Sequence, residues 1–143
     1  MAKPALPHSR WPTVRRTLAT VILSLLLCGC MVMSGETTSK DMQVGSGNLL
    51  TSFVSAEGSA ARVLEVGTPV TTVQVLVILE VETGDLELTF GQPDGTVAFS
   101  VTSRPGTQVT HAGKVNTDAA GQLHYTVSAR GARNGVYQIL VQP

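Results

Sequence analysis

The sequence is poor in cysteine. It has 143 residues and only two cysteines, Cys28 and Cys30, separated by a single glycine. A redox pair normally has two residues between its cysteines. A structural zinc site needs four ligands, two more than this pair could supply. The spacing and the scarcity of cysteine therefore favour neither a redox centre nor a zinc site.

Aromatic residues are also few. The one tryptophan, Trp11, lies near the amino terminus. Sugar-binding sandwiches usually present exposed aromatic platforms, because an aromatic ring offers a large flat contact area. Strand alternation places most of the other aromatic residues on core-facing positions, and these residues are Phe53, Phe90, Phe99, Tyr125 and Tyr137. The sequence therefore gives carbohydrate binding no support.

Acidic residues are absent from the first thirty positions. All ten follow Cys30, against six basic residues, which leaves that portion with a net charge of −4. Nucleic-acid binding depends on clustered Lys and Arg that neutralise phosphates. The charge distribution excludes a nucleic-acid partner. A glycine-rich loop ahead of a helix is also missing, so we predict no nucleotide and no other cofactor.

The chain has no apolar run long enough to span a bilayer. The longest, residues 18–28, has eleven residues, whereas a membrane-crossing helix needs roughly 20. Eleven residues behind a basic segment fit the apolar region of a secretory signal, which runs about 7–15 residues. The pair Arg15 and Arg16 matches a twin-arginine export signal only in part, and a buried core helix is the weaker alternative. We predict a signal peptide over residues 1–29.

The end of this segment resembles the lipobox of bacterial lipoproteins. The four residues are Leu27, Cys28, Gly29 and Cys30, with Cys28 in a slot where Ala or Ser is commoner. The resemblance implies cleavage between Gly29 and Cys30 and lipidation of Cys30, with fatty acyl chains such as palmitate. Because Cys28 would leave with the signal and Cys30 would carry lipid, the mature chain would contain no free thiol and no disulfide.

The lipobox resemblance also predicts where the protein resides. Met31 stands where inner-membrane retention signals of some Gram-negative lipoproteins have Asp. We therefore expect an exported protein anchored to the bacterial cell membrane, in the outer membrane if the cell has one. Residues 31–48 are rich in Ser, Thr and Gly without apolar periodicity, which predicts a flexible tether of about 25 Å.

From residue 49 to 143 the pattern changes to apolar alternation with a period of two. On residues 73–81 one face is wholly apolar, and alternation recurs over 86–90, 97–101, 123–127 and 137–141. Weaker strands are expected at 49–55, 61–66 and 108–115. Turn residues separate these segments at 83–85, 92–96, 118–121 and 132–135. The pattern predicts an all-β domain, a single antiparallel, jelly-roll-like β-sandwich of seven or eight strands.

Residues 68–142 resemble the small jelly-roll modules of secreted bacterial proteins, notably the pre-peptidase C-terminal type. The shared features are a Gly-Asp turn at 84–85, a Pro-Asp-Gly turn at 93–95, the "DAAG" segment at 118–121 and a closing Tyr-x-Ile-x-Val at 137–141. The resemblance implies an appended module with a binding, targeting or structural role and no catalysis. A likeness of fold gives only a prior for function.

Two clusters could carry metal chemistry. A hairpin centred on residue 119 would pair 108–115 with 122–129, which places a half-buried His111 and a solvated His124 on opposite faces and argues against a shared site with Asp118. An acidic group around residues 83–85 could bind calcium, although it lacks a dense calcium loop, and its members are Glu80, Glu82, Asp85 and Glu87.

These patterns predict a lipid-anchored envelope protein whose β-sandwich is a non-catalytic binding, assembly or accessory module with a protein partner of unknown identity. The alternatives are a calcium-dependent adhesion module and a small metal-dependent hydrolase. The hydrolase would use His111, Asp118 or the acidic group.

Overall fold

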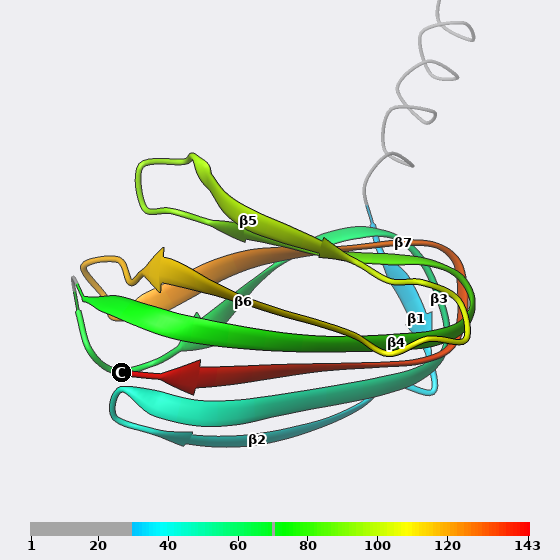
Figure 1. The fold of residues 1–143 in the computed structure, drawn as a ribbon, viewed down its shortest axis with the longest axis horizontal. Coiled ribbons are helices and arrows are strands. Elements are labelled where there is room, and N and C mark those ends of the chain that lie inside the picture. The colour runs from blue at the N-terminus through cyan, green and yellow to red at the C-terminus, as the bar shows by residue number, and fades with distance from the viewer. Residues whose placement is uncertain (1–29, 70) are drawn as a thin grey trace, which may run out of the picture.

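The computed structural model describes residues 30–69 and 71–143, so the predicted signal peptide lies outside the described residues. All regular elements within those ranges are strands, joined in one antiparallel sheet (Figure 1). They are β1 (Val32–Ser34), β2 (Thr37–Gln43), β3 (Ser46–Glu65), β4 (Thr72–Gly91), β5 (Val97–Thr102), β6 (Val109–Asn116) and β7 (Gln122–Gln142). The predicted all-β class is confirmed. Among the described residues, no helix is long and apolar enough to cross a membrane.

Three long strands fold this sheet into a sandwich. In Figure 1 the ribbons of β3, β4 and β7 turn back together at the right-hand side. One half of each strand lies in a five-stranded layer, in the order β2, 46–56, 132–142, 72–83, β6. The other half lies in a four-stranded layer, in the order 58–65, 122–130, 85–91, β5. The jelly-roll-like sandwich therefore has two layers built largely from the same three strands.

The core fills the space between these two layers. Alternate residues of each long strand point inward, as the period of two requires. The largest fully buried side chains include Tyr137, Phe90, Leu79 and Ile139. The faces predicted for 73–81, 86–90, 123–127 and 137–141 are all confirmed as core-facing. The face predicted for 97–101 is confirmed only in part, because Val101 is buried and Phe99 partly buried but Val97 is exposed at the start of the edge strand β5. Burying large aromatic and branched side chains stabilises the fold by about 1.5–3 kcal/mol each.

The bend is made by one glycine in each long strand. Gly58 of β3, Gly84 of β4 and Gly131 of β7 have φ angles of +96°, +77° and +56°. This left-handed conformation is favourable almost only for glycine. The register of β3 with β7 shifts at Ala56/Gly58, and that of β4 with β7 shifts at Thr83/Asp85, which marks β-bulges. We call this end of the sandwich the corner.

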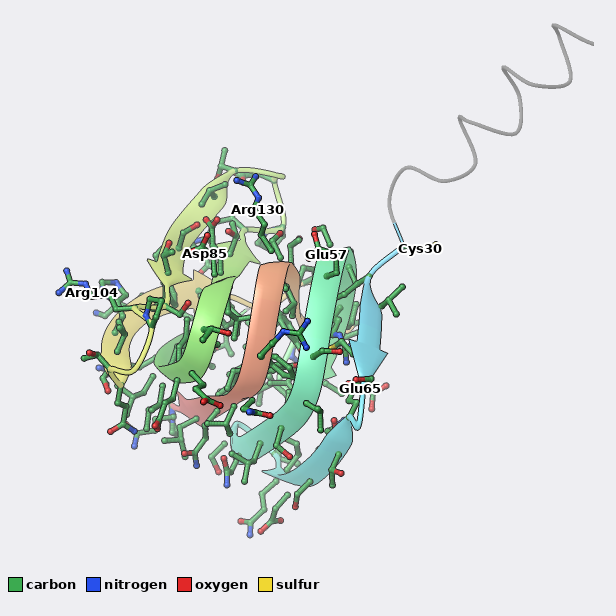
Figure 2. All side chains as sticks on the ribbon, turned by 90° about the vertical axis from the view of Figure 1, so that its right-hand side faces the viewer. Cys30, Glu57, Glu65, Asp85, Arg104 and Arg130 are labelled. Atoms are coloured by element: carbon green, nitrogen blue, oxygen red, sulfur yellow. The ribbon has the colours of Figure 1, made fainter. Side chains whose placement is uncertain are left out.

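A carboxylate completes the corner. The bulges disturb the regular ladder, and the backbone N–H of Gly131 donates instead to Oε2 of Glu57, at 2.6 Å. Figure 2 views this end with Glu57, Asp85 and Arg130 beside the turning ribbons. The bond lies at an exposed position, where water competes for both groups, so we expect it to contribute only about 0.5–1.5 kcal/mol.

Three sequence-based expectations about local structure are wrong. Residues 83–85 and 132–135 are not turns between strands, because β4 and β7 run through them and bend. Segments 108–115 and 122–129 do not form a hairpin, because β6 pairs with β4 in the five-stranded layer. Glycine with positive φ serves both hairpin turns and bulges, so the residue type alone does not distinguish them.

The predicted tether over residues 31–48 is also wrong. This segment contains β1, β2 and the start of β3. Both short strands lie at sheet edges, where β1 pairs with Ser55–Glu57 and β2 pairs with the first part of β3. An edge strand covers little of the core, so its sequence need not be apolar, and a Ser/Thr-rich segment satisfies it. The folded domain therefore begins almost directly after Cys30.

The corner predicts an unequal response to two glycine substitutions. A Cβ at Gly84 would lie 2.2 Å from the carbonyl oxygen of Gly131, whereas a Cβ at Gly95, with φ +85°, meets nothing within 4 Å. We expect Gly84→Ala to lower the free energy of unfolding by about 3 kcal/mol or more, because backbone conformation and packing are both strained. Gly95→Ala should cost about 1 kcal/mol, from conformation alone.

Urea denaturation of residues 30–143 carrying Cys30→Ser measures both changes. Equal losses at the two positions would contradict the packing of β4 against β7 at the corner.

Candidate functional site

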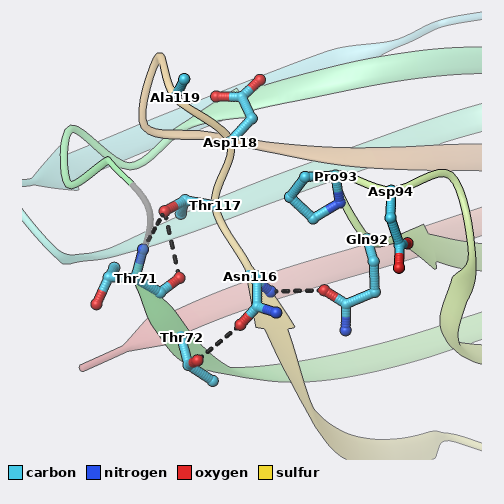
Figure 3. A pocket seen from close by; sticks show the side chains of 9 residues that line it. All are labelled: Thr71, Thr72, Gln92, Pro93, Asp94, Asn116, Thr117, Asp118 and Ala119. Carbon is cyan, nitrogen blue, oxygen red and sulfur yellow. Dashed lines mark hydrogen bonds between the residues drawn. The ribbon is translucent and has the colours of Figure 1, made fainter.

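A polar pocket of about 620 Å³ opens at the end of the sandwich opposite the corner (Figure 3). It lies between the start of β4, the β4–β5 connection and the β6–β7 connection. Its lining residues are Thr71, Thr72, Gln92, Pro93, Asp94, Asn116, Thr117, Asp118 and Ala119. They come from three separate parts of the chain, and the bend of β4 brings these parts to one end.

Thr117 holds the base of this pocket together. Its side chain is 1% exposed, and its hydroxyl accepts a hydrogen bond from the Thr71 N–H at 3.0 Å while it donates to the Thr68 carbonyl at 2.6 Å. The Thr117 N–H also donates to the Thr71 carbonyl at 2.8 Å. These bonds fix the β6–β7 connection against the residues that lead into β4.

Two amide side chains form one wall of the pocket (Figure 3). The backbone N–H of Asn116 donates to Oε1 of Gln92 at 2.9 Å, and Thr72 Oγ1 donates to Oδ1 of Asn116 at 2.6 Å. Both amide oxygens are thus used as acceptors within the protein. The NH2 groups of Gln92 and Asn116 are the donors that a bound molecule would meet, which suits a ligand rich in acceptor oxygens.

Two carboxylates flank the pocket, and the pKa of each is lowered. Asp94 accepts hydrogen bonds from the side chain and backbone of Thr96, at 2.6 and 2.9 Å, which hold its pKa below the usual range. For Asp118, the hydrogen bond from His124 Nε2 at 2.7 Å is the main cause of the lowered pKa. The N–H groups of Gln122 and Ala120 add to it. Both groups therefore present negative charge at neutral pH.

The two histidines lie in different layers. His124 pairs with Asp118 beside the pocket, whereas His111 lies on β6 against Phe99, with ring centroids 5.3 Å apart. His111 pairs with the buried Val77, so it lies on the face of the sheet that points toward the core, as expected. It is nevertheless exposed, because β6 lies at the open edge of the sandwich. The prediction of a half-buried His111 is wrong for that reason. The expected separation of the histidines stands, although its basis, a 108–129 hairpin, does not.

The acidic group is spread along β4 rather than gathered. Glu80 and Glu82 lie before the bend, and Glu87 lies beyond it in the other layer. Asp85 is opposite Arg130, and Glu82 accepts a hydrogen bond from Asn134. Across residues 30–69 and 71–143, no three His, Cys, Asp or Glu side chains form a group that could hold a metal ion.

The aromatic residues have the positions that alternation predicts. Phe53, Phe90, Tyr125 and Tyr137 are buried, and burial is the main cause of the raised pKa of Tyr125. Phe99 is partly buried and stacks on Phe90, with ring centroids 4.8 Å apart. None of the five lines the polar pocket.

Sequence reasoning did not find this pocket. The 92–96 and 118–121 segments were expected to be separate turns, with Asp118 also a candidate metal or hydrolase residue, and Gln92, Asn116 and Thr117 had no expected role. A signal was present, because polar residues cluster directly after two strand ends, at 92–96 and at 116–118. Without the pairing of β6 with β4, the clusters could not be placed at one end of the molecule.

Comparisons with known proteins give no family assignment. No family model matches the chain, and no curated protein matches it at the similarity required. The resemblance to pre-peptidase C-terminal modules therefore stays a prediction.

Three solved structures with a similar fold share little sequence with this chain. One is a carbohydrate-binding module from Cellvibrio mixtus lichenase 5A, solved with cellotriose, with 15% identity over 82% of this chain and 98% of that chain, and a TM-score of 0.40. Another is from Bacillus endospore appendages, disulfide-linked pili, with 12% identity over 79% and 93%, and a TM-score of 0.44. A third, TmCBM61 with β-1,4-galactotriose, has 16% identity over 76% and 85%, and a TM-score of 0.42. We infer nothing about ligand or partner from them.

Thr117 predicts a measurable contribution to stability. Thr117→Val keeps the shape but leaves the Thr71 N–H and the Thr68 carbonyl without their partner. We expect a loss of about 2–4 kcal/mol in the free energy of unfolding, since each unsatisfied buried group costs about 1–3 kcal/mol. The matched control is Thr72→Val, whose exposed hydroxyl bond should be worth about 0.5 kcal/mol. A loss at Thr117 no larger than at Thr72 contradicts this arrangement.

Asp118 predicts a pH-dependent contribution. Because its pKa is lower in the folded state, its stabilising effect is present above the unfolded pKa, about 3.9, and is lost as pH falls through the folded value. We expect Asp118→Asn to lower the melting temperature at pH 7, and the gap from the unsubstituted protein should narrow below about pH 4. Thermal melts across that range measure the gap. A gap that stays constant with pH would show that the charge of Asp118 is not involved.

Proposed function

We propose that the protein is an exported lipoprotein, anchored at the cell envelope through Cys30, whose β-sandwich is a non-catalytic binding or accessory module. The observation that carries the proposal is the Leu27–Cys30 lipobox behind an eleven-residue apolar run and a basic amino-terminal segment. Cys30 is exposed and lies one residue before the first strand. Cleavage before Cys30 would thus release the whole sandwich as one intact unit carrying its anchor.

The polar pocket is the surface that we assign to binding. Its Gln92 and Asn116 NH2 groups and its Asp94 and Asp118 carboxylates supply both donors and acceptors, set on three connections braced by Thr117. The hydroxyl of Thr117 is buried within structural hydrogen bonds, and that of Thr72 donates to Asn116. Among the described residues, the side chain of His124 beside the pocket is hydrogen-bonded to Asp118 and to no hydroxyl group of the lining. These features support recognition of a polar ligand rather than covalent chemistry.

Fatty-acid labelling in a bacterial host tests the anchor. Cys30→Ala should abolish incorporation of labelled palmitate and leave the uncleaved precursor, because the modified thiol is gone. Cys28→Ala is the matched control, and it should label and mature normally, since Ala is common in that slot. Labelling that persists in Cys30→Ala, or that is lost equally in Cys28→Ala, would show that the lipobox assignment is wrong.

A further inference from the structure

We propose that the corner of the sandwich lies against the surface of the bilayer and that the polar pocket faces away from it. This orientation rests on the proposed lipidation of Cys30. Beyond the anchor itself, the proposal gives the domain a defined orientation at the membrane, in which the corner contacts the lipid headgroup layer.

The first observation is that almost no spacer separates Cys30 from the sheet. β1 begins at Val32, which pairs with Glu57 of β3. Met31, the one intervening residue, packs against the hydrophobic core. One residue of extended chain spans at most about 3.6 Å. Acyl chains on Cys30 would therefore bring the edge of the sheet to within a few ångströms of the headgroups.

The second observation places Cys30 at the corner itself. A Cβ added to Gly58 would lie 2.8 Å from the carbonyl oxygen of Cys30 and 3.2 Å from the Cα of Met31. The backbone at the anchor is thus packed on the glycine that bends β3. Figure 2, which views the corner end-on, shows Cys30 beside Glu57, where β1 runs along the edge of β3.

The charges at the corner indicate which force holds the contact. Charged residues of both signs are mixed there, namely Glu57, Glu82, Asp85, Arg104, Arg130 and Arg133. A polybasic surface gains about 1 kcal/mol per Lys or Arg from anionic lipids, but here acidic groups offset the basic ones. The acyl chains would therefore supply the attachment, since two or more chains anchor a protein stably. The contact should form equally on neutral lipids and at high salt.

The strand lengths set the distance of the pocket from the bilayer. The part of β4 that joins the pocket to the bend runs from Thr72 to Thr83. At about 3.3 Å per residue, this segment is roughly 35–40 Å long. The pocket would therefore open to solvent well clear of the headgroups, where a soluble or surface-bound ligand can reach it.

Site-specific quenching tests this pose on the full lipidated protein. Lipidation consumes the Cys30 thiol and no other cysteine follows it, so an introduced cysteine is a unique labelling site. Asp85→Cys and Arg133→Cys report on the corner, and Ala119→Cys and Val44→Cys report on the opposite end. In each variant the introduced cysteine would carry a fluorophore. The labelled protein would then be bound to phosphatidylcholine vesicles that contain a lipid with a nitroxide quencher on its headgroup.

We expect quenching to be several-fold stronger at the corner positions than at Ala119 and Val44. The difference should persist at about 1 M salt, where the Debye length is only ~3 Å. Inserting eighteen Gly/Ser residues between Cys30 and Met31, a spacer of about 25 Å, should remove the difference without releasing the protein. Equal quenching at both ends without the spacer, or stronger quenching at Ala119, would overturn the pose.

Mass spectrometry of Cys30 distinguishes a failure of the proposed lipid anchor from a failure of the proposed orientation. Lipidated, vesicle-bound protein with no end-to-end difference would refute the orientation alone. Protein that carries no lipid on Cys30 and does not bind vesicles would refute the anchor and, with it, the orientation. Unlipidated Cys30→Ser protein with the same labels is the control, and it should show no quenching at any position.

Discussion

Everything in this structure depends on three neighbouring strands bending at the same place. A flat sheet of these strands would leave one long apolar face open to water, and the bend folds that face onto itself. Gly58, Gly84 and Gly131 permit the bend because each has a positive φ angle. The strands also approach so closely there that a side chain at Gly84 would meet the Gly131 carbonyl. The corner thus requires glycine for both conformation and space.

The bend also determines where the polar surface can gather. Because β3, β4 and β7 each return to the end from which they started, the connections before β4, after β4 and before β7 meet at that end. Connections carry unpaired backbone groups and therefore polar residues, so a polar pocket forms there rather than on a sheet face. Thr117 links two of the connections through buried hydrogen bonds, which gives the pocket a fixed base.

Alternation in the sequence was enough to predict the all-β class and the inner faces, because burial of one sheet face imposes a period of two on residues such as Val77 and Ile139. It could not predict that Gly84 lies within a strand, since the same residue type suits a hairpin turn. It also could not identify β2, whose Ser- and Thr-rich sequence is compatible with an edge strand but is equally typical of a linker. The pocket escaped prediction because it depends on long-range pairing.

The corner and the proposed anchor residue, Cys30, lie together in the structure. β1 pairs with β3 at Ser55–Glu57, directly before the bulge at Gly58, and this pairing draws the backbone of Cys30 over that glycine. A side chain at residue 58 would have to displace the backbone of Cys30 and Met31. The bend that closes the sandwich therefore also fixes where an anchor at Cys30 would pull, and the strands that leave the bend carry the pocket to the other end. In a lipoprotein built this way, the fold itself would set the orientation of the binding surface, and a flexible linker would remove that control.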